Sequence, residues 1–396
     1  MRLLAVWDDE TEAELIRMYL GVDDAEVCLT TQVDEFLSLA QARSDWDAIL
    51  LTTAYPDHDR ALEIFQQVRD WHPGTPIVAA SQPGDVYRLA TYLTSGLRSY
   101  LIRDANGDFM FLIHAVIVGA VRQVEADRER LVAEKLRREI DSVRQLQESI
   151  IPQQISCPLN YSIAARYESS QIRVIGGQPV TMAGGDYYDA FTLPDDSVIV
   201  LVGDASGHGM KACMSIMTMH TIIRMIRYDE FRDPAKFVAH VNNVLCNQQL
   251  VQNEGGFITL LYGVLNPATG EFRWASAGHP NPILHRLAED AFEVLGNDGS
   301  TGLPIGILDE VEYETQTAVL PPKCRLMVYT DGIVEAFPTG ASQHEEFGLA
   351  GIQKTLSDCR EAALDQALAR LFDDSHAFTQ GQGRHDDTSV VLVERS

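Results

Sequence analysis

The stretch from Asp108 to Ile150 limits the possible folds of this chain more than any other feature. It contains no proline and one internal glycine, Gly119, and its acidic and basic residues are mixed after Arg122. Such a stretch predicts one long helix, which would run roughly 65 Å at 1.5 Å per residue. Because this exceeds the width of a small domain, the sequence predicts separate folded parts before and after the helix. Pro152 ends it.

The predicted helix also carries a heptad-like apolar pattern. A seam of this kind lets two helices pair along their length, so we expect a homodimer through this linker. The alternative is a single solvated helix held by Glu and Arg pairs four residues apart. The apolar positions form two sets with a phase shift between them: Ile117, Val121, Val124 and Leu131, then Leu136, Ile140, Val143 and Ile150.

Before the helix, residues 1–120 alternate between strand-like and helix-like segments. Repeated βα units predict a parallel sheet covered by helices on both faces, with ligands at the carboxyl ends of the strands. The expected strands are Leu3–Trp7, Ala25–Thr30, Ala48–Thr53, Pro76–Ser81 and Ser99–Arg103, and the expected helices are Glu12–Leu20, Val33–Ala42, Ala61–Trp71 and Val86–Leu93.

This part resembles the receiver domain of two-component signalling. Asp8 and Asp9 match its acidic metal-binding pair, Ser81 matches its strand-four hydroxyl, and Arg103 stands where the family has lysine. The family's phosphoacceptor aspartate falls at Thr52, whose hydroxyl cannot supply the carboxylate nucleophile of an acyl phosphate. Asp57 and Asp59 are expected in the following loop, past the strand end. We therefore expect a pseudo-receiver that docks or dimerises without accepting phosphate.

After the helix, two acidic stretches rich in glycine surround an apolar run. Val198–Val202 is a short apolar segment typical of a strand buried on both faces, and it places Asp204 at its exit. Apolar spacing over Met210–Ile226 predicts a helix, so Gly203–Gly209 forms a tight strand-to-helix passage. The other stretch is Gly184–Asp189, with Asp186 behind two glycines.

Two further acids lie at the ends of later strand-like runs. Asp331 follows Arg325–Thr330, and Asp386 with Asp387 precedes Thr388–Val393. Carboxylates gathered in one cleft repel one another and are stable mainly when cations neutralise them. Hard oxygen ligands on irregular loops suit Mg²⁺ or Mn²⁺, so the sequence predicts a metal site.

The motifs of residues 156–396 resemble, in their order, the PPM family of metal-dependent Ser/Thr protein phosphatases, in its SpoIIE-like branch. The resemblance implies a β-sandwich of two antiparallel sheets flanked by helices, with metals in a cleft at one end. It divides the chain into a receiver-like domain at 1–120, a helical linker at 121–155 and a phosphatase domain at 156–396. The landmarks are Gly184–Asp189, Gly203–Gly209, Ala277–Pro280, Gly302–Gly306, Tyr329–Gly332 and Asp386–Thr388.

The resemblance also assigns roles at the site, where the catalytic set is Asp186, Asp204, Asp331 and Asp386. Asp204 would bridge two Mn²⁺ or Mg²⁺ ions, and Ala205 would lend its backbone carbonyl. Asp331 and Asp386 would complete the shell of the first ion, and Asp186 would hold the second through water. A water shared by two divalent cations becomes a nucleophile near neutral pH, which explains the demand for acids.

Three further polar residues lie within or beside the motifs, and we assign them roles outside the catalytic set. Asp387 is assigned a supporting role or a third metal ion. His208 is expected to support the turn rather than protonate the leaving group, and His279 is expected to be packed and hydrogen-bonded.

Composition limits the kinds of partner and the cellular location that we expect for this protein. With 31 basic and 57 acidic residues, the net charge of −26 disfavours nucleic acid and anionic membrane. The longest apolar span, Phe109–Val121, is shorter than the roughly 20 residues that a bilayer requires. The N-terminus meets acidic residues too early for a signal peptide, and the six cysteines are scattered. We therefore expect a cytoplasmic protein with reduced cysteines.

These features predict a phosphatase acting on phosphoserine or phosphothreonine of a protein. The resemblance implies that the substrate is an anti-sigma-factor antagonist in a bacterial partner-switching pathway, with regulation through the receiver-like domain. One alternative is a noncatalytic adaptor that docks a regulator such as a sigma factor. Another is a small-molecule phosphatase.

Overall fold

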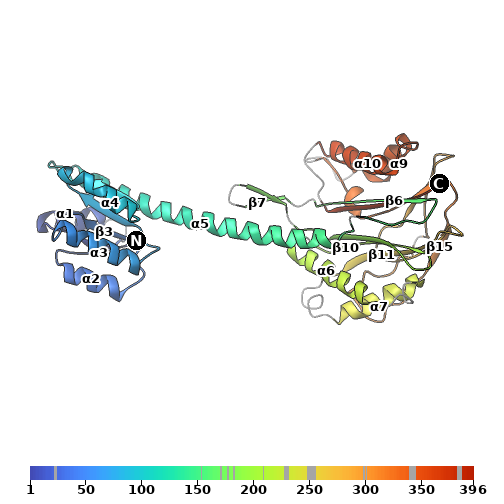
Figure 1. Ribbon diagram of the computed structural model, residues 1–396, viewed down its shortest axis with the longest axis horizontal. Coiled ribbons are helices and arrows are strands. Elements are labelled where there is room, and N and C mark those ends of the chain that lie inside the picture. The colour runs from blue at the N-terminus through green and yellow to red at the C-terminus, as the bar shows by residue number, and fades with distance from the viewer. Residues whose placement is uncertain are drawn as a thin grey trace. The chain divides into compact units, whose positions relative to one another are not determined.

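The structure of the protein is a computed structural model. The chain folds into two compact units, Met1–Glu134 and Lys135–Ser396. It describes residues 1–21, 25–152, 154–169, 172–175, 178–181, 183–207, 209–226, 232–247, 256–297, 299, 301–338, 345–380 and 386–396. Figure 1 shows the elements and their labels.

The first unit is built on a parallel five-stranded sheet in the order β2-β1-β3-β4-β5, which confirms the predicted α/β class. Its central strands are buried on both faces and are therefore almost wholly apolar. The strands are β1 (Arg2–Val6), β2 (Glu26–Thr30), β3 (Ala48–Thr52), β4 (Ile77–Ser81) and β5 (Ser99–Ile102).

Helices cover both faces of this sheet, and one apolar core lies on each side. The predicted helix at Val86–Leu93 is instead a 3-10 helix, Pro83–Arg88, followed by the short α4 (Leu89–Thr94). Asp57 caps the helix that follows β3, and Asp59 lies inside that helix rather than in a loop. The other helices are α1 (Glu10–Leu20), α2 (Val33–Ala42) and α3 (His58–Trp71).

The predicted long helix is α5 (Phe109–Ile150), a single element of 42 residues. Its first turns pack Phe109, Ile113 and Ile117 into the core of the first unit. An 18-residue window of α5 has a mean hydropathy of 1.5 and is 28% buried, so this helix is long and apolar enough to cross a membrane. That is a weak indication of a span, because the core helix of a soluble domain meets the same criterion.

The second unit contains two antiparallel five-stranded sheets, as the sandwich predicted from the family resemblance requires. One sheet has the order β15-β12-β11-β10-β9, with β9 (Asp186–Thr192), β10 (Val198–Ala205), β11 (Ile258–Asn266), β12 (Glu271–Ala277) and β15 (Gln316–Val319). The other has the order β14-β13-β16-β17-β6, with β6 (Tyr161–Glu168), β13 (Ile283–Arg286), β14 (Ala291–Val294), β16 (Cys324–Tyr329) and β17 (Thr388–Arg395). A separate hairpin pairs β7 (Ile172–Ile175) with β8 (Gln178–Thr181).

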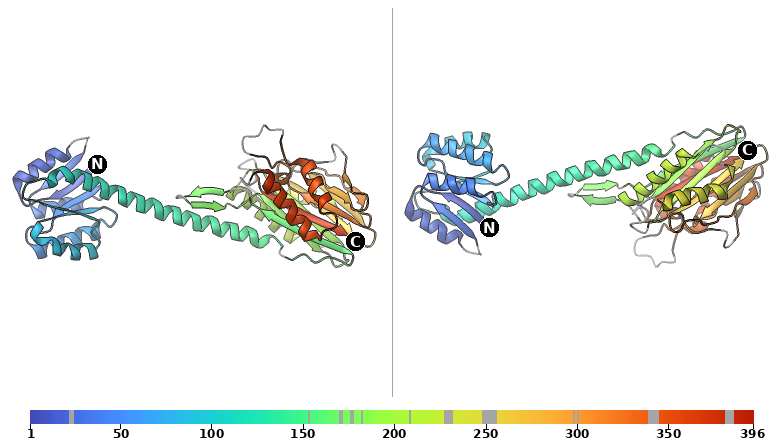
Figure 2. Two further views of the ribbon diagram at one scale, coloured as in Figure 1. Left: turned by 90° about the horizontal axis from the view of Figure 1, so that it is seen from above. Right: turned by 90° about the horizontal axis from the view of Figure 1, so that it is seen from below.

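Two pairs of helices flank the sandwich on opposite sides (Figure 2). The pair α6 (Met210–Met225) and α7 (Pro234–Cys246) packs on the first sheet, and the pair α9 (Gly348–Asp358) and α10 (Leu364–Phe378) packs on the second. The apolar run of β10 is buried on both faces of its sheet. Ile199 and Leu201 face the helices, while Val198, Val200 and Val202 face the opposite sheet.

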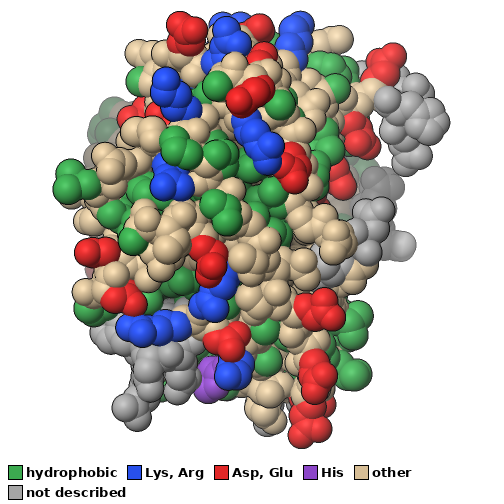
Figure 3. Space-filling model, turned by 90° about the vertical axis from the view of Figure 1, so that its right-hand side faces the viewer, with side chains coloured by type: hydrophobic (Ala, Val, Ile, Leu, Met, Phe, Trp, Pro, Cys, Tyr) green, Lys and Arg blue, Asp and Glu red, His purple; other side chains and the backbone are tan. Residues whose placement is uncertain are grey.

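The excess of acidic residues does not make every face of the protein acidic. On the face that Figure 3 shows, acidic and basic side chains are interspersed among apolar ones. The excess charge of the chain therefore does not mark that face as a binding site.

Candidate functional site

The four predicted acids come from both sheets of the second unit. Asp186 is the first residue of β9 and is paired in register with Asp204 near the end of β10. Asp331 lies two residues after the end of β16 and begins a 3-10 turn (Asp331–Ile333), and Asp386 lies two residues before the start of β17. Strand β10 extends to Ala205, so Asp204 lies inside the strand rather than beyond its exit.

Hydrogen bonds across the sandwich hold these segments together. The Thr330 hydroxyl donates to Asp186 Oδ2 at 2.7 Å and accepts the backbone N–H of Ser389 at 2.8 Å. The backbone N–H of Gly185 donates to Asp387 Oδ2 at 2.7 Å. Asp387, which is 2% exposed, therefore ties the segment before β17 to the segment before β9.

The carboxylates strongly disfavour one another's ionisation. Burial, reinforced by the carboxylates of Asp204 and Asp387, raises the pKa of Asp186 well above its usual range. Burial, followed by the charges of Asp331 and Asp386, raises the pKa of Asp204 to about 8. Burial also raises the pKa of Asp331. A cluster of this kind favours a bound cation, which would stabilise all the carboxylates in their charged form.

The donor atoms fit a hard divalent cation. Asp186 is 1% exposed, and its Oδ1 has no hydrogen-bond partner among the described residues, although a buried carboxylate oxygen normally has one. The surrounding donors are carboxylate and carbonyl oxygens, which Mg²⁺ and Mn²⁺ prefer. Within the described residues, no group of three or more His, Cys, Asp or Glu side chains is already arranged to hold a metal ion, so the fit rests on the chemistry of the donors.

Two glycines allow the segments to approach this closely. A Cβ atom on Gly184 would lie 2.3 Å from both Asp387 Oδ2 and the Tyr167 hydroxyl, and one on Gly185 would lie 2.8 Å from the Ala205 carbonyl oxygen. Any side chain at either position would displace the acidic segments. The glycines of the predicted motif are therefore required by space at these two positions.

The end of α5 reaches the same segments through Gln147. This side chain is 1% exposed; its Oε1 accepts the N–H of Gly184 at 2.9 Å, and its Nε2 donates to the carbonyls of Gly184 and Asp186 at 3.1 and 3.3 Å. Gln147 Nε2 also lies 3.4 Å from the Tyr167 hydroxyl. The backbone that leads into Asp186 is thus fixed by a helix residue.

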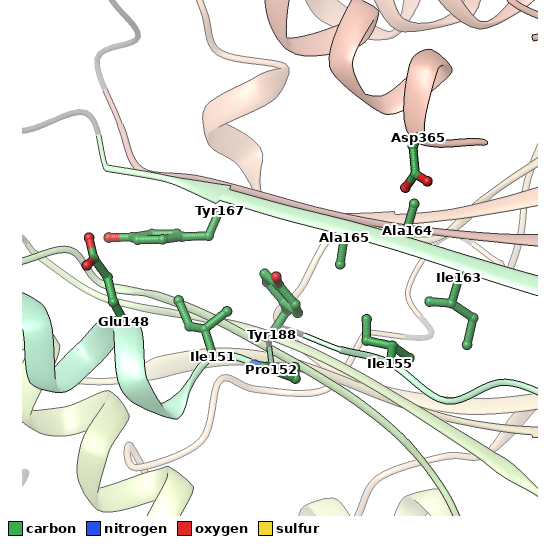
Figure 4. A pocket seen from close by; sticks show the side chains of 10 residues that line it. All are labelled: Glu148, Ile151, Pro152, Ile155, Ile163, Ala164, Ala165, Tyr167, Tyr188 and Asp365. Carbon is green, nitrogen blue, oxygen red and sulfur yellow. The ribbon is translucent and has the colours of Figure 1, made fainter. Parts of the chain in front are cut away.

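Tyr167 separates this network from a cavity of about 410 Å³ at the sandwich edge. Figure 4 shows its ring beside the cavity, with the hydroxyl pointing toward the end of α5. The cavity is lined by Glu148, Ile151, Pro152, Ile155, Ile163, Ala164, Ala165, Tyr167, Tyr188 and Asp365. Tyr167 carried no signal in the sequence, Gln147 lay within the predicted long helix, and Thr330 lay inside a motif without a role of its own.

Of the two histidines singled out in the sequence, only His279 lies within the described residues. His279 is 1% exposed, its Nδ1 lies 3.0 Å from the Thr259 hydroxyl, and burial lowers its pKa to about 3, so it is neutral and packed as expected. His208 lies outside the described residues. Ser206 accepts the backbone N–H of Phe257 at 2.9 Å through its hydroxyl, which anchors the turn.

In the first unit, an arginine occupies the centre of the predicted receiver-like site. Arg103 lies 2.6 Å from Asp8 and 2.6 Å from Glu12, and its guanidinium stacks 4.6 Å over Trp7. Asp9 caps α1 by accepting the N–H of Glu12 at 2.8 Å. Both members of the acidic pair therefore already have protein partners.

The position that matches the family's phosphoacceptor is a buried threonine. Thr52 ends β3 at 2% exposure, and its hydroxyl has no hydrogen-bond partner among the described residues. Ser81 ends β4, as expected, and is also buried.

Comparison with known proteins identifies the second unit. The sequence profile of the family Stage II sporulation protein E (SpoIIE) matches residues 194–396, just over half of the chain. This chain belongs to the SpoIIE family of PP2C-type serine/threonine phosphatases. Asp204, Asp331 and Asp386 lie inside the part that matches the SpoIIE family, and Asp186 lies just before it.

Curated relatives extend beyond the SpoIIE part. Phosphoserine phosphatase RsbU of Bacillus subtilis is 23% identical over 319 residues, which cover 79% of this chain and 87% of RsbU. Protein IcfG of Synechocystis is 24% identical over 328 residues, which cover 77% of this chain and 48% of IcfG. The match therefore spans about half the length of IcfG.

Solved structures support the same fold. The SiaA-PP2C domain of Pseudomonas aeruginosa superposes with a TM-score of 0.53 at 17% identity, covering 66% of this chain and 98% of that domain. The RsbU and RsbW domains of Rv1364c from Mycobacterium tuberculosis superpose with a TM-score of 0.50 at 23% identity, covering 62% of this chain and 63% of that structure. These likenesses concern the fold alone.

Proposed function

We propose that this chain is a metal-dependent phosphatase that hydrolyses phosphoserine or phosphothreonine on a protein substrate. The observation that carries the proposal is the pairing of Asp186 with Asp204 on neighbouring strands, where the charges of Asp331 and Asp386 help to raise the pKa of Asp204. The similarity to a protein named phosphoserine phosphatase supports the type of substrate.

Asp186, Asp204, Asp331 and Asp386, with the Ala205 carbonyl, would hold two Mn²⁺ or Mg²⁺ ions. Such ions, when bound, supply an acidified water molecule and positive charge beside the phosphate. Thr330 and Asp387 would hold Asp186 and the segment before it in place ahead of substrate binding, and preorganised groups need less rearrangement during the reaction. Asp387 holds the N–H of Gly185, so we assign it to positioning the segment before Asp186.

Hydrolysis of p-nitrophenyl phosphate with Mn²⁺ tests the enzyme assignment. We expect activity in the wild type and a loss of at least about a hundredfold in Asp204→Asn and Asp331→Asn, because each removes a charge that a cation requires. Asp196→Asn is the matched control, since Asp196 lies in an exposed turn. Equal activity in all four proteins would defeat the assignment of the acids, and no activity in any of them would favour the noncatalytic adaptor.

Membership of the SpoIIE family supports a proposal for the physiological substrate. We propose an anti-sigma-factor antagonist of a partner-switching pathway, in the cytoplasm, with activity regulated through the first unit. Comparing kcat/KM for a phosphorylated antagonist and for small phosphate esters separates this proposal from a small-molecule phosphatase, which would favour the esters.

We also propose that the first unit is a pseudo-receiver. Thr52 lacks the carboxylate that accepts phosphate, and Arg103 already neutralises Asp8. Incubation with acetyl phosphate or beryllofluoride and Mg²⁺ should give no labelling of this unit and no change in phosphatase rate. Stoichiometric labelling would refute the pseudo-receiver.

A homodimer through α5 is the last part of this proposal. Leu131 and Leu136 are 67% and 46% exposed on the helix, so these two positions of the predicted apolar seam are available to a partner helix. Sedimentation equilibrium should give a dimer for the wild type and a monomer for the double variant Leu131→Glu and Leu136→Glu. A wild-type monomer at micromolar concentration would favour the solvated single helix.

A further inference from the structure

We propose that the loop Gly302–Glu310 is a docking surface for the folded protein that carries the phosphorylated residue, through Leu303, Ile307 and Leu308. This inference rests on the proposed phosphatase function and names the contact that selects a protein over a small ester. The three side chains are 51%, 50% and 57% exposed. Exposed apolar side chains that gather in one patch often mark a protein interaction site, whereas isolated ones are common on any surface.

The loop is joined to the sheet that carries the acids. Ile305, inside the loop, is fully buried and exchanges two backbone hydrogen bonds with Ile258, of 2.9 and 3.0 Å. Ile258 is in turn paired in register with Ala205. Two strand spacings separate Ala205 from Ile305, which is roughly 10 Å. A protein bound at the acids would reach this loop, whereas a small phosphate ester would not.

Two asparagines of helix α7 hold the backbone of the loop by hydrogen bonds. Asn242 is fully buried; its Oδ1 accepts the N–H of Gly306 at 2.9 Å, and its Nδ2 donates to the Leu308 carbonyl at 2.8 Å. The N–H of Glu310 donates to Asn243 Oδ1 at 2.9 Å. A buried amide that satisfies both sides of a loop makes its shape specific.

The start of the loop is fixed as tightly as its end. A Cβ on Gly278, whose φ is +67°, would lie 2.5 Å from Pro304 Cγ, so Pro304 packs directly on that turn. The Tyr313 hydroxyl donates to the Leu303 carbonyl at 3.0 Å. The three apolar side chains thus stand exposed on a preorganised backbone, which lowers the entropy lost on binding a partner.

The charge of the chain favours apolar contacts for this purpose. The net charge is −26, and a phosphorylated partner brings further negative charge to the site. Long-range electrostatics would oppose such an encounter, so short-range apolar contacts are needed to hold the partner. Met210 and Met214, in the first turns of α6 beyond Gly209, are 41% and 43% exposed and offer adaptable apolar contacts of the same kind.

The test compares two substrates in four proteins: wild type, Ile307→Asp, Leu308→Asp and the control Val319→Asp. Val319 is 63% exposed in the same sheet but pairs with Glu271, at the opposite end of β12 from Ala277. One substrate is p-nitrophenyl phosphate with Mn²⁺, and the other is a phosphorylated anti-sigma-factor antagonist from the same genome.

We expect Ile307→Asp and Leu308→Asp to lower kcat/KM for the antagonist by about tenfold or more, mainly through KM, because each loses apolar contact and adds repulsion. Both should keep p-nitrophenyl phosphate hydrolysis within about twofold of wild type, which also shows that they fold. Val319→Asp should match the wild type on both substrates.

Three outcomes would overturn the docking surface. In the first, the loop variants match the wild type on the antagonist. In the second, both substrates lose activity together, which would make the loop a support of the site. In the third, the wild type hydrolyses p-nitrophenyl phosphate but no antagonist. A wild type inactive on both substrates would refute the proposed phosphatase itself, which is a distinguishable result.

Discussion

Gln147 holds Gly184 by both of its backbone polar groups: its Oε1 accepts the glycine N–H at 2.9 Å and its Nε2 donates to the glycine carbonyl at 3.1 Å. Gly184 lies two residues before Asp186. The last turns of a long helix are therefore in direct contact with the backbone that presents an acid of the site.

Replacing Gln147 with methionine should lower phosphatase kcat by about tenfold or more, since the backbone before Asp186 loses its partners at a buried position. Methionine keeps the length of the side chain but not its hydrogen bonds. Gln145→Met is the matched control, because Gln145 is exposed on the same helix and its side chain donates to the exposed Asp141. If the two variants have equal kinetics, the contact does not position the site.

Thr330→Val should weaken the apparent affinity for Mn²⁺, because Asp186 loses the 2.7 Å hydrogen bond from the Thr330 hydroxyl. Valine has nearly the same shape, but the buried N–H of Ser389 also loses its acceptor, so some stability should be lost as well. Thr330→Ser keeps the hydroxyl and should restore most of the affinity. Titrating activity against Mn²⁺ measures the shift, and failure of serine to rescue would assign the effect to packing.

His279 should make stability depend on pH. Because burial lowers its pKa to about 3 from an unfolded value near 6.5, the unfolded chain binds a proton that the folded chain does not. His279 therefore contributes stability that is present above about pH 6.5 and is lost progressively as the pH falls toward 3. Urea unfolding at pH 7 and 5 should show a smaller loss in His279→Gln than in the wild type. His114→Gln, on an exposed face of α5, should behave as the wild type.

Arg103→Ala should destabilise the first unit by about 2 kcal/mol, because Asp8 and Glu12 lose a largely buried partner. Arg60→Ala is the control, since the Arg60 pair with Glu63 is exposed and should contribute at most about 0.5 kcal/mol. Urea unfolding followed by tryptophan fluorescence reports on this unit through Trp7, Trp46 and Trp71, whereas Trp274 reports on the second unit. A similar change in both variants would mean that Arg103 acts only as a surface charge.

Mn²⁺ should stabilise the second unit independently of catalysis. A ligand present at a hundredfold excess over its Kd adds about 2.7 kcal/mol to the free energy of unfolding. Calorimetry should therefore show an upper transition that rises with Mn²⁺ and falls with EDTA. Asp204→Asn should lose this response, and the exposed control Asp196→Asn should keep it. A response of equal size in Asp204→Asn would place the ion elsewhere.

The sequence predicted the elements whose patterns are strong and local. The apolar run Val198–Val202 became a strand because both of its faces are covered, and the long stretch free of proline became α5. The 3-10 helix at Pro83–Arg88 was missed because apolar spacing alone does not separate it from an α-helix.

The acids of the site were visible in the sequence because their motifs surround them with glycine. Their supports were harder to predict. Gln147 and Tyr167 act through contacts with Gly184, which depend on the approach of β6 and the end of α5, and no spacing in the chain encodes that approach. Asn242 likewise looked like any polar residue of a helix until its loop partner was known.

The crowding at Gly184 and Gly185 means that the acidic cluster depends on two positions that have no side chain at all. Even alanine at Gly184 would meet two oxygen atoms at 2.3 Å. A saturation library across this segment should therefore yield almost no active clone altered at either codon, while exposed positions nearby accept most replacements.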